Sequence, residues 1–159
     1  MKEIILNTIH KPRNNYRKYT ALVSDEDFGK VNQHNWCVSN QGCNLYAVGK
    51  IKRENIPMHT FITGFEQTDH IDSNGLNNQR SNLREATQKQ NCMNRTKRAN
   101  CSSKYKGVYW RKDRERWLAY IKFDKRHSHL GLFKSEINAA QAYNFAAEKY
   151  FGEFAKFNK

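Results

Sequence analysis

The sequence predicts an α+β protein built from two small parts with a basic connection between them. The chain has 159 residues, enough for one ordinary domain or two small ones. A polar, basic stretch without periodicity covers residues 92–103. After this stretch the sequence shows a regular pattern of three strands followed by one helix. These observations together favour two separately folded parts.

Weaker patterns mark the first part of the chain. Residues 19–23 and 44–52 have the composition of strands. Ser24 precedes three consecutive acidic residues, which predicts a helix start because acidic side chains are favourable near the positive end of the helix dipole. A second short helix is predicted from Met58 to Ile62, ended by Gly64.

Strict alternation marks residues 115–123 as a strand with two different faces. One face is apolar, and the other carries two cations and a tyrosine. Residues 105–111 and 127–133 are predicted as the neighbouring strands. The apolar face comprises Trp117, Ala119, Ile121 and Phe123, and the opposite face Arg116, Leu118, Tyr120 and Lys122.

A helix is predicted to cover this sheet. Ser135 can cap its start and Gly152 can end it. Small and aromatic residues recur along it at 3-1-3-1-3 spacing, which forms one stripe on a helix surface. We expect the stripe to pack on the apolar face of the sheet and to leave the basic face open. Its members are Ala139, Ala142, Tyr143, Ala146, Ala147 and Tyr150.

The charge of the chain indicates an anionic polymer as its partner. The formal net charge is +13 and the isoelectric point about 9.7. Such a charge suits nucleic acid or a membrane surface. No apolar run approaches the ~20 residues that a membrane-spanning helix needs, and the N-terminus lacks a signal-peptide core. We therefore expect a nucleic-acid partner, no membrane, and a cytoplasmic location.

Four cysteines occur, and none of them forms a C-x-x-C pair, which argues against a zinc knuckle or ribbon. Reduced thiols are expected in a cytosolic protein. The spacing leaves two disulfides open as alternatives, Cys37–Cys43 and Cys92–Cys101.

An Asp-His pair, Asp69 and His70, precedes a loop rich in Asn and Gly, and Asn82 and Asn91 follow downstream. Carboxylate and amide oxygens are hard ligands suited to Mg²⁺. A histidine can take a proton from water near neutral pH. Residues 59–91 hold 3 basic and 4 acidic side chains and lie between two basic flanks. A metal and a base in a basic chain suggest hydrolysis of a phosphodiester.

The segment from His59 to Asn94 resembles the HNH nuclease family, in the subgroup typical of phage and intron-encoded homing endonucleases. The motifs that match are MH (58–59), DHIDSNGLNN (69–78), RSNLREAT (80–87) and QKQN (88–91). The resemblance implies a ββα-metal fold, in which two strands and a helix hold one divalent ion.

This resemblance also implies a role for each residue of the motif. Asp69 and Asn91 would be the metal ligands, His70 the general base, and Asn82 the brace of the loop. His59, in an apolar setting, would be a structural residue of the site. Many relatives have His at the position of Asn91, and the amide oxygen here suits Mg²⁺ or Mn²⁺.

Residues 103–158 resemble the DNA-binding domain of plant ethylene-response factors, a three-stranded antiparallel sheet packed on one helix. The matching motifs are SKYKGVYW (103–110), RWLAYI (116–121), HLGLF (129–133) and AAQAYNFAAEKYFGEFAKFN (139–158). In that family the sheet enters the major groove. The resemblance implies DNA contacts from Lys106, Tyr109, Arg111, Arg116, Tyr120, Lys122, His127 and His129. The plant family often has Arg or Trp at these positions, so its base preference does not transfer.

The predicted domains are therefore residues 1–94, an N-terminal extension plus a nuclease module with its core at 58–94, and residues 103–159, the DNA-binding domain. Residues 95–102 form a basic linker, which either follows the phosphate backbone or is a solvated tether. We expect a metal-dependent endonuclease of duplex DNA, acting as a monomer in a bacterial or phage-infected cell. The alternatives are a DNA-binding regulator with an inactive nuclease centre and an RNA-binding protein.

Overall fold

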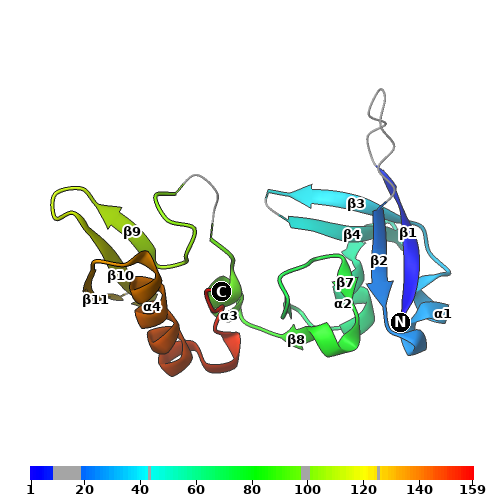
Figure 1. Cartoon of the computed structure of the whole chain (residues 1–159). Helices are drawn as coiled ribbons and strands as arrows, with labels where there is room; N and C mark the ends of the chain where they lie inside the picture. The colour runs from blue at the N-terminus through cyan, green and yellow to red at the C-terminus, as the bar shows by residue number, and fades with distance from the viewer. Residues whose placement is uncertain (9–18, 43, 98–100, 125) are drawn as a thin grey trace, which may run out of the picture. The chain divides into compact units, whose positions relative to one another are not determined.

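A computed structural model describes residues 1–8, 19–42, 44–97, 101–124 and 126–159. The chain forms two compact units, Met1–Gln88 and Lys89–Lys159, and the mixed α+β class is confirmed (Figure 1). The units part before the predicted linker at 95–102, of which residues 98–100 lie outside the described residues. The assignment of residues 1–94 as the nuclease part and of residues 103–159 as the DNA-binding domain stays a prediction.

A six-stranded sheet forms most of the first unit (Figure 1). The strand order is β5-β4-β3-β1-β2-β7, and all neighbours are antiparallel except the pairs β1–β3 and β2–β7. The predicted strands at 19–23 and 44–52 are confirmed, whereas the others had no prediction. The strands are β1 (Lys2–Thr8), β2 (Tyr19–Val23), β3 (Trp36–Gln41), β4 (Asn44–Ile51), β5 (Glu54–Pro57) and β7 (Asn77–Asn78).

Two short helices, α1 (Asp25–Val31) and α2 (Met58–Thr63), accompany this sheet as predicted. Gly64 ends α2 with a φ of 73°, the left-handed conformation that glycine adopts without strain. Ser24 occupies the N-cap of α1, but its side chain does not cap the helix. Its Oγ instead accepts a hydrogen bond from the backbone N–H of Arg80 at 3.0 Å, so a tertiary contact replaces the local one.

The motif region adds a second, smaller sheet. Strands β6 (Thr68–His70) and β8 (Leu83–Glu85) pair antiparallel, with a short 3₁₀ helix, η1 (Arg80–Asn82), before β8. Helix α3 (Gln88–Asn94) follows β8 in the chain. Two strands and a helix thus occur in the order that the resemblance implies. The prediction of an irregular stretch from residue 92 onward was wrong for its first residues, because α3 continues to Asn94.

The second unit holds the predicted three strands and helix. The sheet order is β11-β10-β9, both pairs antiparallel. The elements are β9 (Val108–Arg111), β10 (Arg116–Phe123), β11 (Arg126–Phe133), α4 (Glu136–Phe151) and a 3₁₀ helix, η2 (Gly152–Phe154).

Strand β9 begins three residues later than predicted because Gly107 has a φ of 72° and bends the chain. A Cβ atom at this position would lie 2.1 Å from Cδ2 of Tyr143, so the backbone approaches that ring as only glycine allows. Ser135 stands at the N-cap of α4 without a side-chain capping bond.

Helix α4 packs on the apolar face of the sheet, as predicted. Ile121 of β10 joins Tyr143, Ala146 and Ala147 in one core cluster, and further alanines of α4 meet Ala119 in another. The predicted stripe was wrong at one end, because Tyr150 is 37% exposed. Its ring stacks on that of Phe123 with the centroids 5.3 Å apart, and Ala140 and Phe151 are buried instead.

The opposite face of the sheet is less open than predicted. Leu118 is only 3% exposed, although alternation places it on this face. Its cross-strand partners are Tyr109 and Leu132, and the ring of Tyr109 meets that of Tyr120 edge-on at 5.5 Å. Large neighbours on three adjacent strands therefore cover Leu118.

The thiols of Cys92 and Cys101 are unpaired, so the alternative disulfide between them is not formed. Cys37 is also unpaired, and Cys43 lies outside the described residues. Within the described ranges, no helix is long and apolar enough to cross a membrane.

Candidate active site

The Asp-His pair lies on strand β6, where both side chains are buried. Asp69 is 3% exposed and His70 is 6% exposed. Pairing with β8 places Arg84 opposite Asp69. The Nε and Nη2 atoms of Arg84 donate to Oδ2 of Asp69 at 2.9 Å and 2.7 Å. Such charge-assisted hydrogen bonds hold the buried carboxylate in one orientation.

Burial lowers the pKa of His70 below the ordinary value of histidine. A hydrogen bond with Asn78 and the charges of Asp72 and Asp69 offset only part of this effect. The neutral imidazole is therefore the favoured form at neutral pH, and a neutral imidazole can accept a proton. The Nε2 atom of His70 lies 3.4 Å from Oδ1 of Asn78.

Two rings from two other elements pack against the base. His59 of α2 meets His70 edge-on with the centroids 5.0 Å apart, and Tyr46 of β4 lies 5.8 Å from each. Burial, aided by the charge of His70, lowers the pKa of His59 to about 4. The Nδ1 atom of His59 is buried without a hydrogen-bond partner in the described part of the chain. His59 thus packs as a neutral ring against the predicted base.

Asn82 closes the loop between β6 and β8. Its Oδ1 accepts from the backbone N–H of Asp72 at 3.0 Å. Its Nδ2 donates to Oδ1 of Asp72 at 2.9 Å and to the carbonyl of Asn77 at 2.8 Å. These hydrogen bonds link the two ends of the loop, as a brace would. The role of Asn82 in activity stays a prediction.

The same loop lies against strand β4 of the large sheet. A Cβ atom at Gly75 would be 2.4 Å from the carbonyl oxygen of Leu45 and 2.5 Å from the ring of Tyr46. Only glycine permits this approach. The N-terminal sheet, for which the sequence predicted no part in the site, therefore forms one of its walls.

Tyr46, Asn78 and Arg84 are the site residues that sequence reasoning missed. Asn78 and Arg84 lie inside the matching motifs, so their polar character within a short buried segment was an available signal. Tyr46 had no such signal, because only the packing of β4 on the loop brings it to His70.

Asn91, the second predicted metal ligand, lies on α3 and is partly buried. Helix α3 belongs largely to the second unit, whereas Asp69 and His70 belong to the first. That Asp69 and Asn91 share one ion stays a prediction. The described residues contain no cluster of three or more His, Cys, Asp or Glu side chains placed to hold a metal. The oxygen ligands present suit Mg²⁺, which keeps several waters and binds substrate phosphates.

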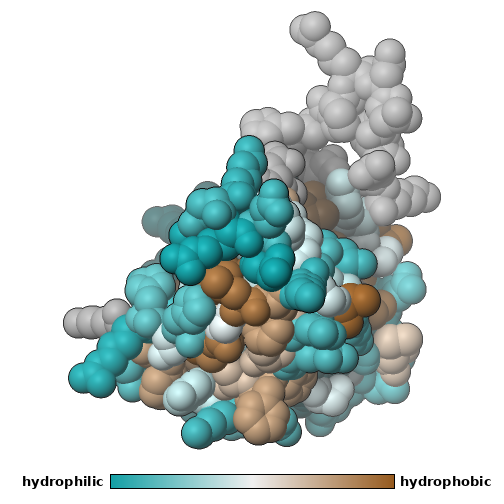
Figure 2. Space-filling view, turned by 60° about the vertical axis from the view of Figure 1, so that its left-hand side comes forward, coloured by the Kyte–Doolittle hydropathy of each residue, from teal (hydrophilic) through white to brown (hydrophobic). Residues whose placement is uncertain are grey.

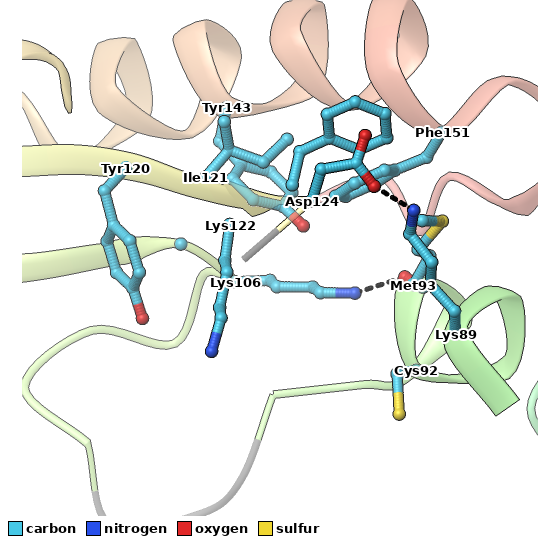
Figure 3. Close-up of a pocket in the computed structure, with 12 residues that line it drawn as sticks. Lys89, Cys92, Met93, Lys106, Tyr120, Ile121, Lys122, Asp124, Tyr143 and Phe151 are labelled. Atoms are coloured by element: carbon cyan, nitrogen blue, oxygen red, sulfur yellow. Dashed lines mark hydrogen bonds and ion pairs between the residues drawn. The ribbon is translucent and has the colours of Figure 1, made fainter. Parts of the chain in front are cut away.

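The predicted DNA-contacting residues occupy different settings in the second unit. Lys122, His127 and His129 are exposed, and the others are partly buried. Arg111 forms two hydrogen bonds with the carboxylate of Asp113, at 2.7 Å and 2.6 Å. Lys106 differs from the rest, since its ammonium donates to the carbonyl of Met93 inside a cavity (Figure 3). The partly buried positions are Lys106, Tyr109, Arg111, Arg116 and Tyr120.

The chain is 35% identical over 144 residues to an uncharacterized HNH endonuclease of Acanthamoeba polyphaga mimivirus, covering 87% of this chain and 74% of that protein. The chain belongs to the HNH endonuclease family. The matched share exceeds either unit, so the likeness to the mimivirus HNH protein extends into both.

A second relative of this HNH chain is Protein 3.8 of Escherichia phage T7. It is 36% identical over 90 residues, which cover 56% of this chain and 73% of that protein. No family model and no solved structure match the chain.

Proposed function

We propose that this HNH protein is a metal-dependent endonuclease that hydrolyses phosphodiester bonds in duplex DNA. The observation that carries the proposal is the buried His70 beside a buried Asp69, in a chain similar to an HNH endonuclease along most of its length. The strongly basic composition suits DNA as the substrate.

In this proposal, His70 takes a proton from water, and the resulting hydroxide attacks the scissile phosphorus in line with the leaving 3′ oxygen. The products carry 5′-phosphate and 3′-hydroxyl ends. Burial keeps the imidazole neutral before the reaction, and the carboxylates of Asp69 and Asp72 stabilise the imidazolium that forms.

Asp69 and Asn91 would hold one divalent ion, Mg²⁺ or Mn²⁺. The bound ion would supply positive charge for the phosphate and the leaving oxygen. Arg84 keeps the Asp69 carboxylate in place through two hydrogen bonds to Oδ2. Asn82 keeps the loop after His70 closed, which holds the base and the predicted ligand in one arrangement.

We further propose that the second unit binds duplex DNA as an ethylene-response-factor-type domain, with its three-stranded sheet toward the major groove. Its strand and helix order supports this, as do the exposed Lys122, His127 and His129 on one face. A homing-type role in a phage or an intron fits the viral and phage origins of the two relatives.

Incubation of plasmid DNA with the purified protein tests the function, with Mg²⁺ or Mn²⁺ against EDTA and with RNA of the same sequence in parallel. We expect nicking or linearisation of DNA only with the metal. His70→Ala should abolish cleavage at nearly unchanged DNA affinity, since the base acts on water and not on ground-state binding. His34→Ala is the matched control, because His34 is a partly buried histidine that packs on Trp36 and Phe61.

Binding without cleavage under every metal condition would favour the alternative, a DNA-binding regulator with an inactive centre. Cleavage or tight binding of RNA alone would favour the RNA-binding alternative. Equal loss of binding and cleavage in His70→Ala would show that His70 is a structural residue and not the base.

A further inference from the structure

The second unit contains a cavity of about 680 Å³ that the proposed reaction does not use. Its walls come from α3, from β10, from the turn before β9 and from α4 (Figure 3). A cavity of this size is within the range of small-molecule sites. The inner wall is apolar and aromatic, formed by Met93, Ile121, Phe123, Tyr143 and Phe151.

Positive charge borders this apolar wall. Lys89, Lys106 and Lys122 line the cavity together with one carboxylate, that of Asp124. Lys89 forms an ion pair with Asp124, which neutralises that carboxylate (Figure 3). Two lysines therefore remain in excess. The cavity suits a ligand that combines a flat apolar body with an anionic group.

Of the three lysines, Lys106 is the one whose charged ammonium is buried against a neutral acceptor. Its ammonium donates to the carbonyl oxygen of Met93, a neutral acceptor. Burial, with a smaller contribution from Lys156, lowers the pKa of Lys106 to about 8. A bound anion would offset the cost of burying this charge.

We propose that the cavity receives one unpaired nucleotide of a DNA strand, with its base against the aromatic wall and its phosphate beside Lys106 and Lys122. This inference rests on the proposed function, because it takes DNA as the partner. Lys106, Tyr120 and Lys122 line the cavity and are also predicted DNA contacts. A base can enter only after it leaves the helical stack, so DNA with an unpaired nucleotide is the preferred ligand.

The apolar lining of the cavity supports the same ligand. Figure 2 shows apolar residues gathered in one area of the face in view, bordered by hydrophilic ones. A duplex offers mainly phosphates to such a surface, whereas an extruded base offers a face that stacks on aromatic side chains.

Two exposed cysteines of the second unit allow a direct test. Cys92 lines the cavity and Cys101 does not. The full chain is treated with iodoacetamide in EDTA, and modification of each cysteine is followed by peptide mass spectrometry. The probes are a short duplex and the same duplex with one unpaired thymidine. We expect the second probe to slow modification of Cys92 and to leave Cys101 unchanged, and to bind about fivefold tighter or more.

Substitutions locate the effect. Lys106→Met keeps the aliphatic stem and removes the charge, and Lys104→Met is the matched control on an exposed neighbour. Cys92→Trp fills the cavity from α3, with Cys92→Ser as its control. We expect Lys106→Met and Cys92→Trp to remove the preference for the unpaired nucleotide and the two controls to keep it.

Equal protection of both cysteines, or equal protection by the fully paired duplex, would overturn the proposal. Protection of Cys92 by inorganic phosphate as strong as that by DNA would show an anion site without a base. Protection by oleate but not by DNA would show a site for an apolar carboxylate. The protection assay does not depend on cleavage. A protein that binds the probe in the cavity but never cuts DNA would therefore contradict the nuclease proposal and leave the cavity proposal intact.

Discussion

The Nε2 atom of His70 lies 3.4 Å from Oδ1 of Asn78, whose side chain is completely buried. When Nε2 carries the proton and donates to this oxygen, the lone pair of the neutral ring is on Nδ1. Asn78 in turn lies on β7, which pairs with β2 so that Val23 faces Asn78. The N-terminal sheet thus positions Asn78 beside the predicted base.

Asn78→Leu should lower kcat on duplex DNA on the order of 10-fold to 100-fold, because the tautomer of His70 is no longer selected. DNA affinity in EDTA should hardly change. Asn78→Asp retains an acceptor oxygen and should recover much of the loss. The ¹⁵N NMR shifts of the His70 ring at one neutral pH report the tautomer directly.

Stability separates this role from simple packing. The Nδ2 atom of Asn78 is buried without a hydrogen-bond partner among the described residues, so Asn78→Leu should cost only about 1–3 kcal/mol of folding free energy, which follows from removing the acceptor of Nε2 of His70. If Asn78→Leu unfolds the protein, or leaves both kcat and the ring shifts unchanged, then Asn78 does not position the base.

Asp69→Asn and Asn91→Ala should each shift the metal titration of cleavage to higher Mg²⁺ concentration. Asp69→Ala is the poorer test, because it would remove both side-chain oxygens of Asp69 from the guanidinium of Arg84, which is only 15% exposed, and cost about 3–5 kcal/mol of stability, whereas Asp69→Asn keeps one acceptor. Mn²⁺ at higher concentration should rescue Asn91→Ala, since Asp69 remains. An unchanged titration in both variants would place the ion elsewhere.

Acidification should destabilise the protein through His59. Its pKa in the folded state is lowered to about 4 from 6.5, so the unfolded chain binds the proton first as the pH falls below 6.5. Between pH 7 and pH 5, proton binding by the unfolded chain at His59 lowers the free energy of unfolding by about 2 kcal/mol. Urea denaturation should show a smaller loss in His59→Gln, and an identical loss would mean that His59 is not buried neutral.

Arg116→Ala and Lys122→Ala should each reduce the salt dependence of DNA binding by about one unit of the log–log slope. Both residues lie on the sheet face opposite α4. Lys149→Ala is the control, because Lys149 is exposed on α4. Affinity measured over a range of salt concentrations gives the slopes. A wild-type slope in the double variant would show that this face does not meet DNA.

Much of the second unit could be predicted because its signals are local. Alternation over residues 115–123 identified β10, and the alanine spacing identified α4. The errors arose where a distant neighbour decides burial. Leu118 has the pattern of an open face, yet Tyr109 and Leu132 on adjacent strands cover it. Tyr150 has the pattern of the stripe, yet it stacks at the sheet edge on Phe123.

For the candidate site, Asp69, His70, Asn82 and Asn91 were predicted from the spacing in one short segment and from its resemblance to the HNH family. The partners of the base depended on the folded chain. Tyr46 and His59 meet His70 through the packing of β4 and α2, and Asn78 is held by a parallel pairing with β2. Periodicity and spacing record which residues share a strand or a helix face. Contacts between distant segments depend instead on how sheets and loops pack, and that packing leaves no repeating pattern in the chain.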